Sequence, residues 1–140
     1  MRLVLDTSVL VAGLRSRSGA SHQVLLAARS NRFATLVNVA MYLEYEEVLK
    51  RPEHRLAHGL TENEIDIYLG AMMLFAERVE RRFLWRPQLN DPSDEAVLET
   101  AINGRADAIV THNVRDFAPA QRFGIGIKRP QEILKVVGHE

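Results

Sequence analysis

The chain has 140 residues, of which 46% are hydrophobic and 26% charged, and its 18 Lys and Arg residues balance 18 Asp and Glu residues. This length suits one domain with a single core, and the composition is that of a folded globular protein. The absence of cysteine excludes disulfides, thiolate metal sites and a cysteine nucleophile. A net charge of zero argues against a protein that coats polyanions, although a catalytic site for nucleic acid needs only a local basic rim.

The first residues lack the apolar segment of a secretion signal, because Asp6 interrupts the run that begins at Leu3. No apolar stretch approaches the roughly 20 residues that a membrane helix needs. We therefore expect a cytoplasmic protein with no membrane contact.

The first half of the chain alternates predicted strands and helices. Residues 3–5 are wholly apolar, as in a strand that is buried on both faces of a parallel sheet. Pro52 is expected to stop a helix and to begin a polar loop that carries the exposed pair His54 and His58. In chain order we predict a strand at 3–5, helices at 9–14 and 22–30, a strand at 33–39 and a helix at 40–50.

The second half continues this alternation. Thr61 and Glu64 form a capping box before a long helix, and Ile67 and Leu74 lie off its main apolar stripe, which indicates a second apolar face for a partner. The predicted elements are this helix at 62–79, a strand at 83–85, a helix from 92 to Gly104, strands at 108–110 and 126–128, and a helix at 130–137. Strands that alternate with helices predict a parallel α/β sheet with right-handed crossovers.

Acidic and polar residues follow two of the predicted strands. Asp6 ends the first strand, and Asn113 and Asp116 come just after the strand at 108–110. Open parallel sheets place their active sites outside the carboxyl ends of the strands. These residues are therefore candidates for a common site.

Two more acids occupy helix positions that should be apolar. Glu44 shares a helix face with Met41 and Val48, and Asp94 shares one with Val97 and Leu98, whereas Glu95 and Glu99 should face outward. A carboxylate turned toward a core is costly unless it is compensated, and a divalent cation can compensate several carboxylates at once.

Each acid also has a structural explanation. Asp6 and Asp91 suit helix caps, Asp94 would stabilise a helix N-terminus, Glu44 would pair with a buried arginine and Asp116 suits a turn. The combination of strand-end and inward-facing acids favours a Mg²⁺ or Mn²⁺ site that hydrolyses phosphodiesters.

Basic residues supply a rim for such a site. Arg15 and Arg17 lie in or beside the polar loop that follows the first predicted helix, and we expect them to contact phosphate. Two further basic clusters have the composition of solvated surfaces; they comprise Lys50, Arg51 and Arg55, and Arg78, Arg81, Arg82 and Arg86.

Four segments in order resemble the PIN-domain family, and in particular the toxins of VapBC-type toxin–antitoxin pairs. They are LVLDTSVL at 3–10, LEYEEVL at 43–49, DPSD at 91–94 and ADAIVTHNVRDF at 106–117. The resemblance covers nearly the whole chain and implies a single domain over residues 1–140, with a three-layer α/β/α sandwich around a central parallel sheet.

The resemblance also implies an endoribonuclease toxin that depends on Mg²⁺ or Mn²⁺. Asp6, Glu44 and Asp94 match the first three acidic positions; Asn113 stands where many relatives have aspartate, so Asp116 would supply the fourth carboxylate. We expect Asp6, Asp94 and Asp116 to hold the metal and Glu44 to position the attacking water, with Asn113 and Thr111 in support. The family further implies an RNA substrate, homodimers and an antitoxin that blocks the site.

Two alternatives remain. The neutral Asn113 would also suit a catalytically decayed PIN module that binds RNA or a protein. A structure-specific DNA nuclease is the other, although the chain lacks room for a DNA-clamping insertion.

Overall fold

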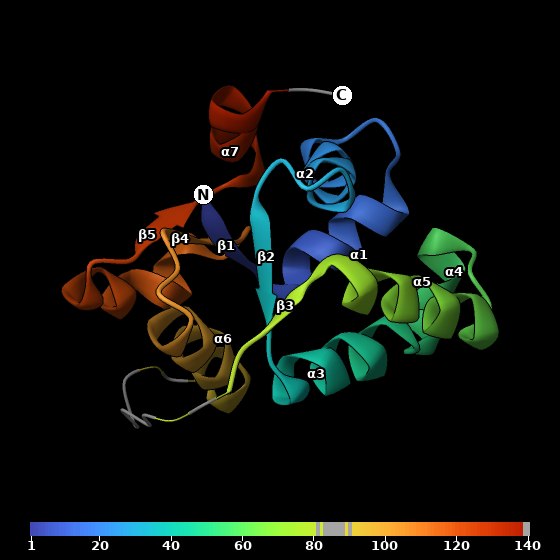
Figure 1. Cartoon of the computed structure of the whole chain (residues 1–140). Coiled ribbons are helices and arrows are strands. Elements are labelled where there is room, and N and C mark those ends of the chain that lie inside the picture. The colour runs from blue at the N-terminus through green and yellow to red at the C-terminus, as the bar shows by residue number, and fades with distance from the viewer. Residues whose placement is uncertain (81, 83–88, 90, 139–140) are drawn as a thin grey trace.

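The computed structural model describes residues 1–80, 82, 89 and 91–138, and five parallel strands form its central sheet in the order β3-β2-β1-β4-β5 (Figure 1). The four pairings are all parallel, which confirms the predicted sheet. The strands are β1 (Arg2–Leu5), β2 (Ala34–Val37), β3 (Glu77–Arg78), β4 (Ala108–Val110) and β5 (Gly126–Lys128).

Helices cover both faces of the sheet. One layer contains α1, α2 and α7, in which α2 packs against the other two; α6 and the 3-10 helix η1 pack together on the opposite face (Figure 1). This confirms the three-layer sandwich. The helices are α1 (Thr7–Arg15), α2 (Ala20–Arg29), α3 (Val39–Leu49), α4 (Pro52–His58), α5 (Glu62–Phe75), α6 (Pro92–Asn103), η1 (Val114–Phe123) and α7 (Pro130–Val137).

Local sequence signals explain where several elements begin. The apolar run at 3–5 is fully buried in β1, as a strand between two helical layers must be. The Thr61 hydroxyl accepts a hydrogen bond from the Glu64 N–H at 3.1 Å, and the Glu64 carboxylate accepts one from the Thr61 N–H at 3.0 Å, so the capping box forms as predicted. Asp91 caps α6 by accepting the Ser93 N–H at 2.9 Å.

The region after Pro52 is a helix rather than the predicted loop. Pro52 occupies the first turn of α4, and Gly59 ends it with a φ of 75°. Proline just inside a helix start and glycine just past its end are a recognised combination. The prediction gave weight to Pro52 only as the end of α3 and not as the beginning of α4.

The predicted helix at 62–79 is too long. α5 ends at Phe75, and the chain then pairs with β2: the Val79 N–H donates to the Val37 carbonyl at 2.8 Å. Tertiary pairing here overrides the helical periodicity of the sequence. The strand predicted at 83–85 lies outside the described residues.

The outward orientation predicted for Glu95 and Glu99 is also wrong. Their exposed fractions are 4% and 1%, and the N–H of Leu89 donates to the Glu95 carboxylate at 2.7 Å. The fold therefore buries a face of α6 that the helical pattern assigned to solvent, and Leu89, which precedes α6 in the chain, contacts it. Among the helices of the described residues, none combines the length and apolarity needed to cross a membrane.

Candidate active site

The ends of β1 and β4 place two candidate residues beside each other. The Asp6 N–H donates to the Val110 carbonyl at 2.9 Å, and the Thr111 N–H donates to the Lys128 carbonyl at 2.9 Å, so the sheet continues through both residues. Strand connections run in opposite directions from β1, toward β2 and β3 on one side and β4 and β5 on the other. Open α/β sheets bind ligands at such a switch point.

Neighbouring hydroxyl groups hold the Asp6 carboxylate. Its Oδ2 accepts hydrogen bonds from Ser8 Oγ at 2.7 Å and from Thr111 Oγ1 at 2.8 Å. Ser8 Oγ in turn accepts the His112 N–H at 3.2 Å, and Thr111 Oγ1 accepts the Asn113 N–H at 2.9 Å. Within the described chain Asp6 does not cap α1 with its side chain, so capping does not explain its position.

A cavity of about 630 Å³ opens at this edge of the sheet. We call it the acidic cavity because four carboxylates line it: Asp6, Glu44, Asp91 and Asp94. α3 supplies Glu44, and the first turn of α6 supplies Asp94. The fold thus brings together Asp6, Glu44, Asp94 and Asn113 from distant parts of the sequence.

Asp116 lies differently from the other four predicted site residues. It is exposed in the first turn of η1 and is not among the residues that line the acidic cavity. Its charge nevertheless contributes to the raised pKa of Asp94, so it lies within electrostatic reach of that carboxylate.

Burial and repulsion between neighbouring carboxylates raise the pKa values of two acids in the cavity. Burial raises the pKa of Asp94 from 3.8 to about 7, and repulsion from Asp6, Asp91, Asp116 and Glu44 adds to the shift. Burial also raises the pKa of Glu44, with a further contribution from the charge of Glu47, while Arg51 and a hydrogen bond from Ser93 oppose the rise. A positive charge bound in the cavity would therefore favour loss of the proton from Asp94.

The donor chemistry of the cavity fits a hard divalent cation. Mg²⁺ prefers carboxylate oxygens, retains several waters and often needs only one or two carboxylates from the protein. Both hydrogen bonds to Asp6 fall on Oδ2, which leaves Oδ1 for a ligand. Within the described residues, no three His, Asp or Glu side chains already form a group that could hold a metal ion. The fit is therefore to a few carboxylates with water, not to a closed protein cage.

Basic residues also line the cavity. Arg15 from the end of α1, and Arg51 and His54 from the start of α4, line it together with the carboxylates. Arg51 is held by Glu47, whose Oε2 lies 2.8 Å from its guanidinium. Arg17, which the sequence suggested as a second phosphate contact, is not among the lining residues.

Sequence reasoning missed two groups at the cavity. His54 was assigned to an exposed loop, and the proline and glycine that bracket α4 were the signal that would have placed it on a helix. Ser93 was considered only as part of the start of α6; its hydrogen bond to Glu44 joins α6 to α3, a contact that no local pattern reveals.

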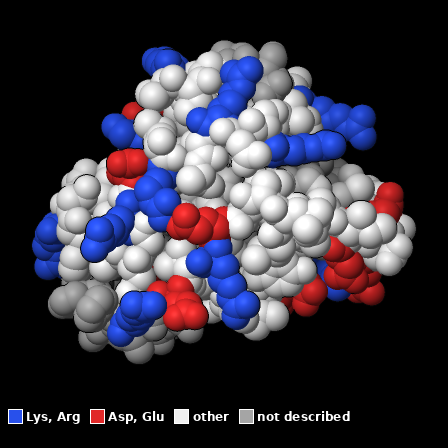
Figure 2. All heavy atoms as spheres, viewed as in Figure 1, with Lys and Arg blue, Asp and Glu red and all other residues white. Residues whose placement is uncertain are grey.

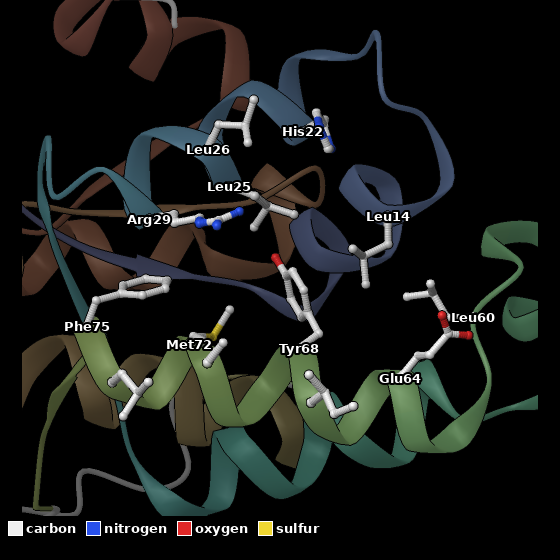
Figure 3. A pocket seen from close by; sticks show the side chains of 13 residues that line it. Leu14, His22, Leu25, Leu26, Arg29, Leu60, Glu64, Tyr68, Met72 and Phe75 are labelled. Carbon is white, nitrogen blue, oxygen red and sulfur yellow. The ribbon is translucent and has the colours of Figure 1, made fainter.

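A second hollow, of about 730 Å³, lies between α2 and α5. We call it the apolar groove: Leu25 and Arg29 of α2 face Tyr68 and Met72 of α5 across it (Figure 3). The surface over α5 carries few charged side chains in Figure 2. Other lining residues include Leu14 of α1, Ile67 and Leu74. Ile67 and Leu74 are 64% and 89% exposed, which confirms the second apolar face of this helix.

Comparison with known proteins agrees with this architecture. The family model for the PIN domain matches residues 2–115, so the chain belongs to the PIN-domain family. Among solved structures, it is similar to a chain of VapBC2 from Rickettsia felis, crystallised bound to a DNA fragment from its promoter; the TM-score is 0.64 and the identity 13%, and the match covers 92% of this chain and 98% of that one. No curated protein sequence matches.

Proposed function

We propose that the protein is a metal-dependent endoribonuclease that hydrolyses RNA phosphodiester bonds, and that it is the toxin of a type II toxin–antitoxin pair. Membership of the PIN-domain family and similarity to a VapBC2 chain support this proposal. The observation that carries it is Asp94, a carboxylate whose pKa is raised to about 7 beside three other acids of one cavity. A strongly raised pKa in a cavity is typical of a functional site, and a bound cation would offset the repulsion among these carboxylates.

Each residue has a role in this proposal. Asp6 and Asp94 would hold Mg²⁺ or Mn²⁺, with Asp116 assisting from η1. The bound ion would stabilise negative charge on the scissile phosphate. Glu44, whose pKa is raised by burial, would orient the attacking water and accept its proton.

Polar and basic neighbours would support this chemistry. Thr111 keeps Asp6 in place through its 2.8 Å hydrogen bond. Asn113 would orient water or phosphate. Arg15, which also lines the cavity, would bind the RNA backbone.

Cleavage of labelled single-stranded RNA in Mg²⁺ or Mn²⁺ tests the proposal. Asp6→Asn and Asp94→Asn should each lower the rate at least about a hundredfold without unfolding the chain. Asp107→Asn is a matched control, because Asp107 lies at the other end of β4 and binds the Arg2 N–H at 2.7 Å. Mn²⁺ should raise the melting temperature of the wild type more than that of Asp94→Asn. Full activity in either site variant would contradict the assignment.

A decayed PIN module is the second candidate. It is favoured by the neutral Asn113 and by the position of Asp116 outside the lining of the acidic cavity. This candidate predicts weak Mn²⁺ binding and no metal-dependent cleavage of any RNA. Parallel assays on single-stranded RNA, tRNA and flapped DNA separate both candidates from a DNA nuclease.

The apolar groove is the proposed antitoxin surface. Leu14, in the last turn of α1, lines the groove, and the next residue, Arg15, lines the acidic cavity. A partner segment that leaves the groove over this turn would therefore reach the site and block it. The exposed Val39 and Leu43 of α3 lie outside the groove and supply apolar surface for the proposed homodimer.

A test in cells follows. Expression of the chain should arrest growth, and co-expression of a small protein encoded beside it should relieve the arrest. Relief by Asp6→Asn without the partner would link toxicity to the cavity. For the homodimer, Leu43→Asp should convert a dimer to a monomer in light scattering.

A further inference from the structure

His54 and His58 lie one turn apart on α4, but the structure uses them differently. Both ring nitrogens of His58 serve the fold: Nε2 lies 3.0 Å from the Leu49 carbonyl oxygen, and Nδ1 accepts the Leu60 N–H at 2.9 Å. His54 Nδ1 is closed off from solvent and has no hydrogen-bond partner in the described part of the chain. Unlike that of His58, the ring of His54 therefore does not stabilise the fold through hydrogen bonds from both nitrogens.

The environment of His54 points to a ligand. α4 contributes no fully buried residue to the core, yet His54 lines the acidic cavity together with Asp6 and Asp94. Because Nδ1 is enclosed, the ring can meet a ligand only through the edge that carries Nε2. Because the enclosed Nδ1 has no acceptor for a hydrogen among the described residues, we assign the donor hydrogen of the ring to Nε2.

The charge balance of the cavity indicates which ligand. The four carboxylates that line the cavity repel a phosphodiester, so a nucleic acid needs hydrogen-bond donors among the other lining residues. Arg15, Arg51 and His54 are also in this lining, and Arg51 is already paired with Glu47. His54 is therefore a further donor of the same lining that is available to a phosphate.

We propose that His54 is a substrate-binding residue that donates a hydrogen bond from Nε2 to a phosphate oxygen of single-stranded RNA. The proposal rests on the function proposed above and assigns a contact within the same site. It also predicts that His58, four residues later, has no part in RNA binding.

The experiment compares four proteins: wild type, His54→Ala, His54→Gln and His58→Gln. Affinity for a fluorescein-labelled single-stranded RNA of mixed sequence is measured by anisotropy in EDTA, which prevents cleavage, and melting temperature by circular dichroism. His54→Ala should bind about tenfold more weakly, the effect of losing one hydrogen bond to a charged group, with an unchanged melting temperature. His54→Gln keeps an N–H donor at a similar reach and should recover most of the affinity. In Mn²⁺, His54→Ala should raise KM and leave kcat unaltered.

His58→Gln should show the reverse pattern, with a lower melting temperature and wild-type affinity. Wild-type affinity in His54→Ala would overturn the proposal, as would a loss of stability like that of His58→Gln. Equal weakening in His54→Ala and His54→Gln would overturn the hydrogen bond. If the wild-type protein neither binds nor cleaves RNA, the proposed function itself fails, and this outcome differs from all the others.

Discussion

The acidic cavity and the apolar groove have similar volumes, about 630 and 730 Å³, but opposite linings. The cavity lies where β1 and β4 end and gathers carboxylates from β1, α3 and α6. The groove lies between two helices and gathers leucine, methionine and aromatic side chains. Strand ends of a parallel sheet collect polar groups from distant parts of the sequence, whereas neighbouring helices leave apolar faces. Under the proposed function, reaction and partner recognition would occupy separate surfaces, and Leu14 and Arg15 at the end of α1 join the two.

Two exposed leucines provide the strongest test of this separation. Leu74 of α5 and Leu56 of α4 are 89% and 88% exposed, but only Leu74 lines the apolar groove. Leu74→Asp should weaken binding of the proposed antitoxin about a hundredfold, because it would place a charge in an apolar interface. Titration calorimetry with the partner, and RNA cleavage by the free protein, measure the two surfaces independently.

Leu56→Asp is the matched control and should change neither property. Equal loss of partner binding in both variants would mean that the groove is not the contact. Loss of cleavage in Leu74→Asp without the partner would mean that the two surfaces are not separate.

The acidic cavity could be predicted from the sequence better than the apolar groove. Asp6 follows an apolar run directly, and Asp94 and Glu44 interrupt apolar helix faces; these are local signals, and the fold brings all three residues to the same cavity. Only one wall of the apolar groove was predicted from the sequence. Ile67 and Leu74 indicated a second apolar face on α5, but nothing indicated that α2 lies opposite.

What could not be predicted depended on contacts between segments. Glu95 and Glu99 have the pattern of an exposed face, and only the folded structure shows that this face is buried. The end of α5 is decided by the pairing of Val79 with Val37. The local pattern at Pro52 was sufficient for α4, but it was interpreted as an end rather than a beginning.

Substitution of Thr111 should have the next largest effect, and this substitution tests the acidic cavity without changing the apolar groove. It is fully buried and links Asp6 Oδ2 to the Asn113 N–H. Thr111→Val keeps the shape but removes both hydrogen bonds, so we expect about a tenfold to hundredfold loss of cleavage and a loss of about 1–2 kcal/mol of stability. Single-turnover cleavage and urea unfolding measure the two effects.

Thr35 of β2 supplies the control for this substitution. It is 1% exposed, and its hydroxyl has no partner among the described residues. Thr35→Val should leave cleavage unchanged and stability equal or higher. If Thr111→Val loses only stability, Asp6 does not depend on this hydrogen bond for its position.

A smaller effect, on RNA affinity, is expected from the basic residues of the cavity. Arg15 lines the cavity and Arg17, two residues later, does not. Arg15→Ala should weaken RNA binding several-fold and reduce the slope of log K against log salt by about 0.7, the value for one phosphate contact with a single strand. Arg17→Ala should change the slope less; equal changes would indicate a diffuse electrostatic effect rather than a defined contact.

The smallest expected effect is a pH dependence of stability that arises from Asp94 in the acidic cavity and not from residues of the apolar groove. The native protein holds a proton on Asp94 up to about pH 7, whereas the unfolded chain releases it near 3.8. Unfolding therefore releases a proton from Asp94 in this interval, and the contribution of Asp94 to the free energy of unfolding falls as the pH rises from about 4 to about 7. Asp94→Asn removes this fall, so in metal-free buffer it should melt roughly a few degrees higher relative to the wild type at pH 8 than at pH 4.

Glu64, at the edge of the apolar groove, supplies a control of opposite sign. Its hydrogen bonds with Thr61 lower its pKa from 4.5, so its contribution is present above that value and is lost as the pH falls through the native pKa. Glu64→Gln should therefore lose stability relative to the wild type at pH 8 and approach it in acid. Melting curves from pH 3 to 8 measure both variants. A difference between Asp94→Asn and the wild type that stays constant over this range would show that neither burial nor neighbouring charge raises the pKa of Asp94. The acidic cavity and the apolar groove would then differ only in the polarity of their linings.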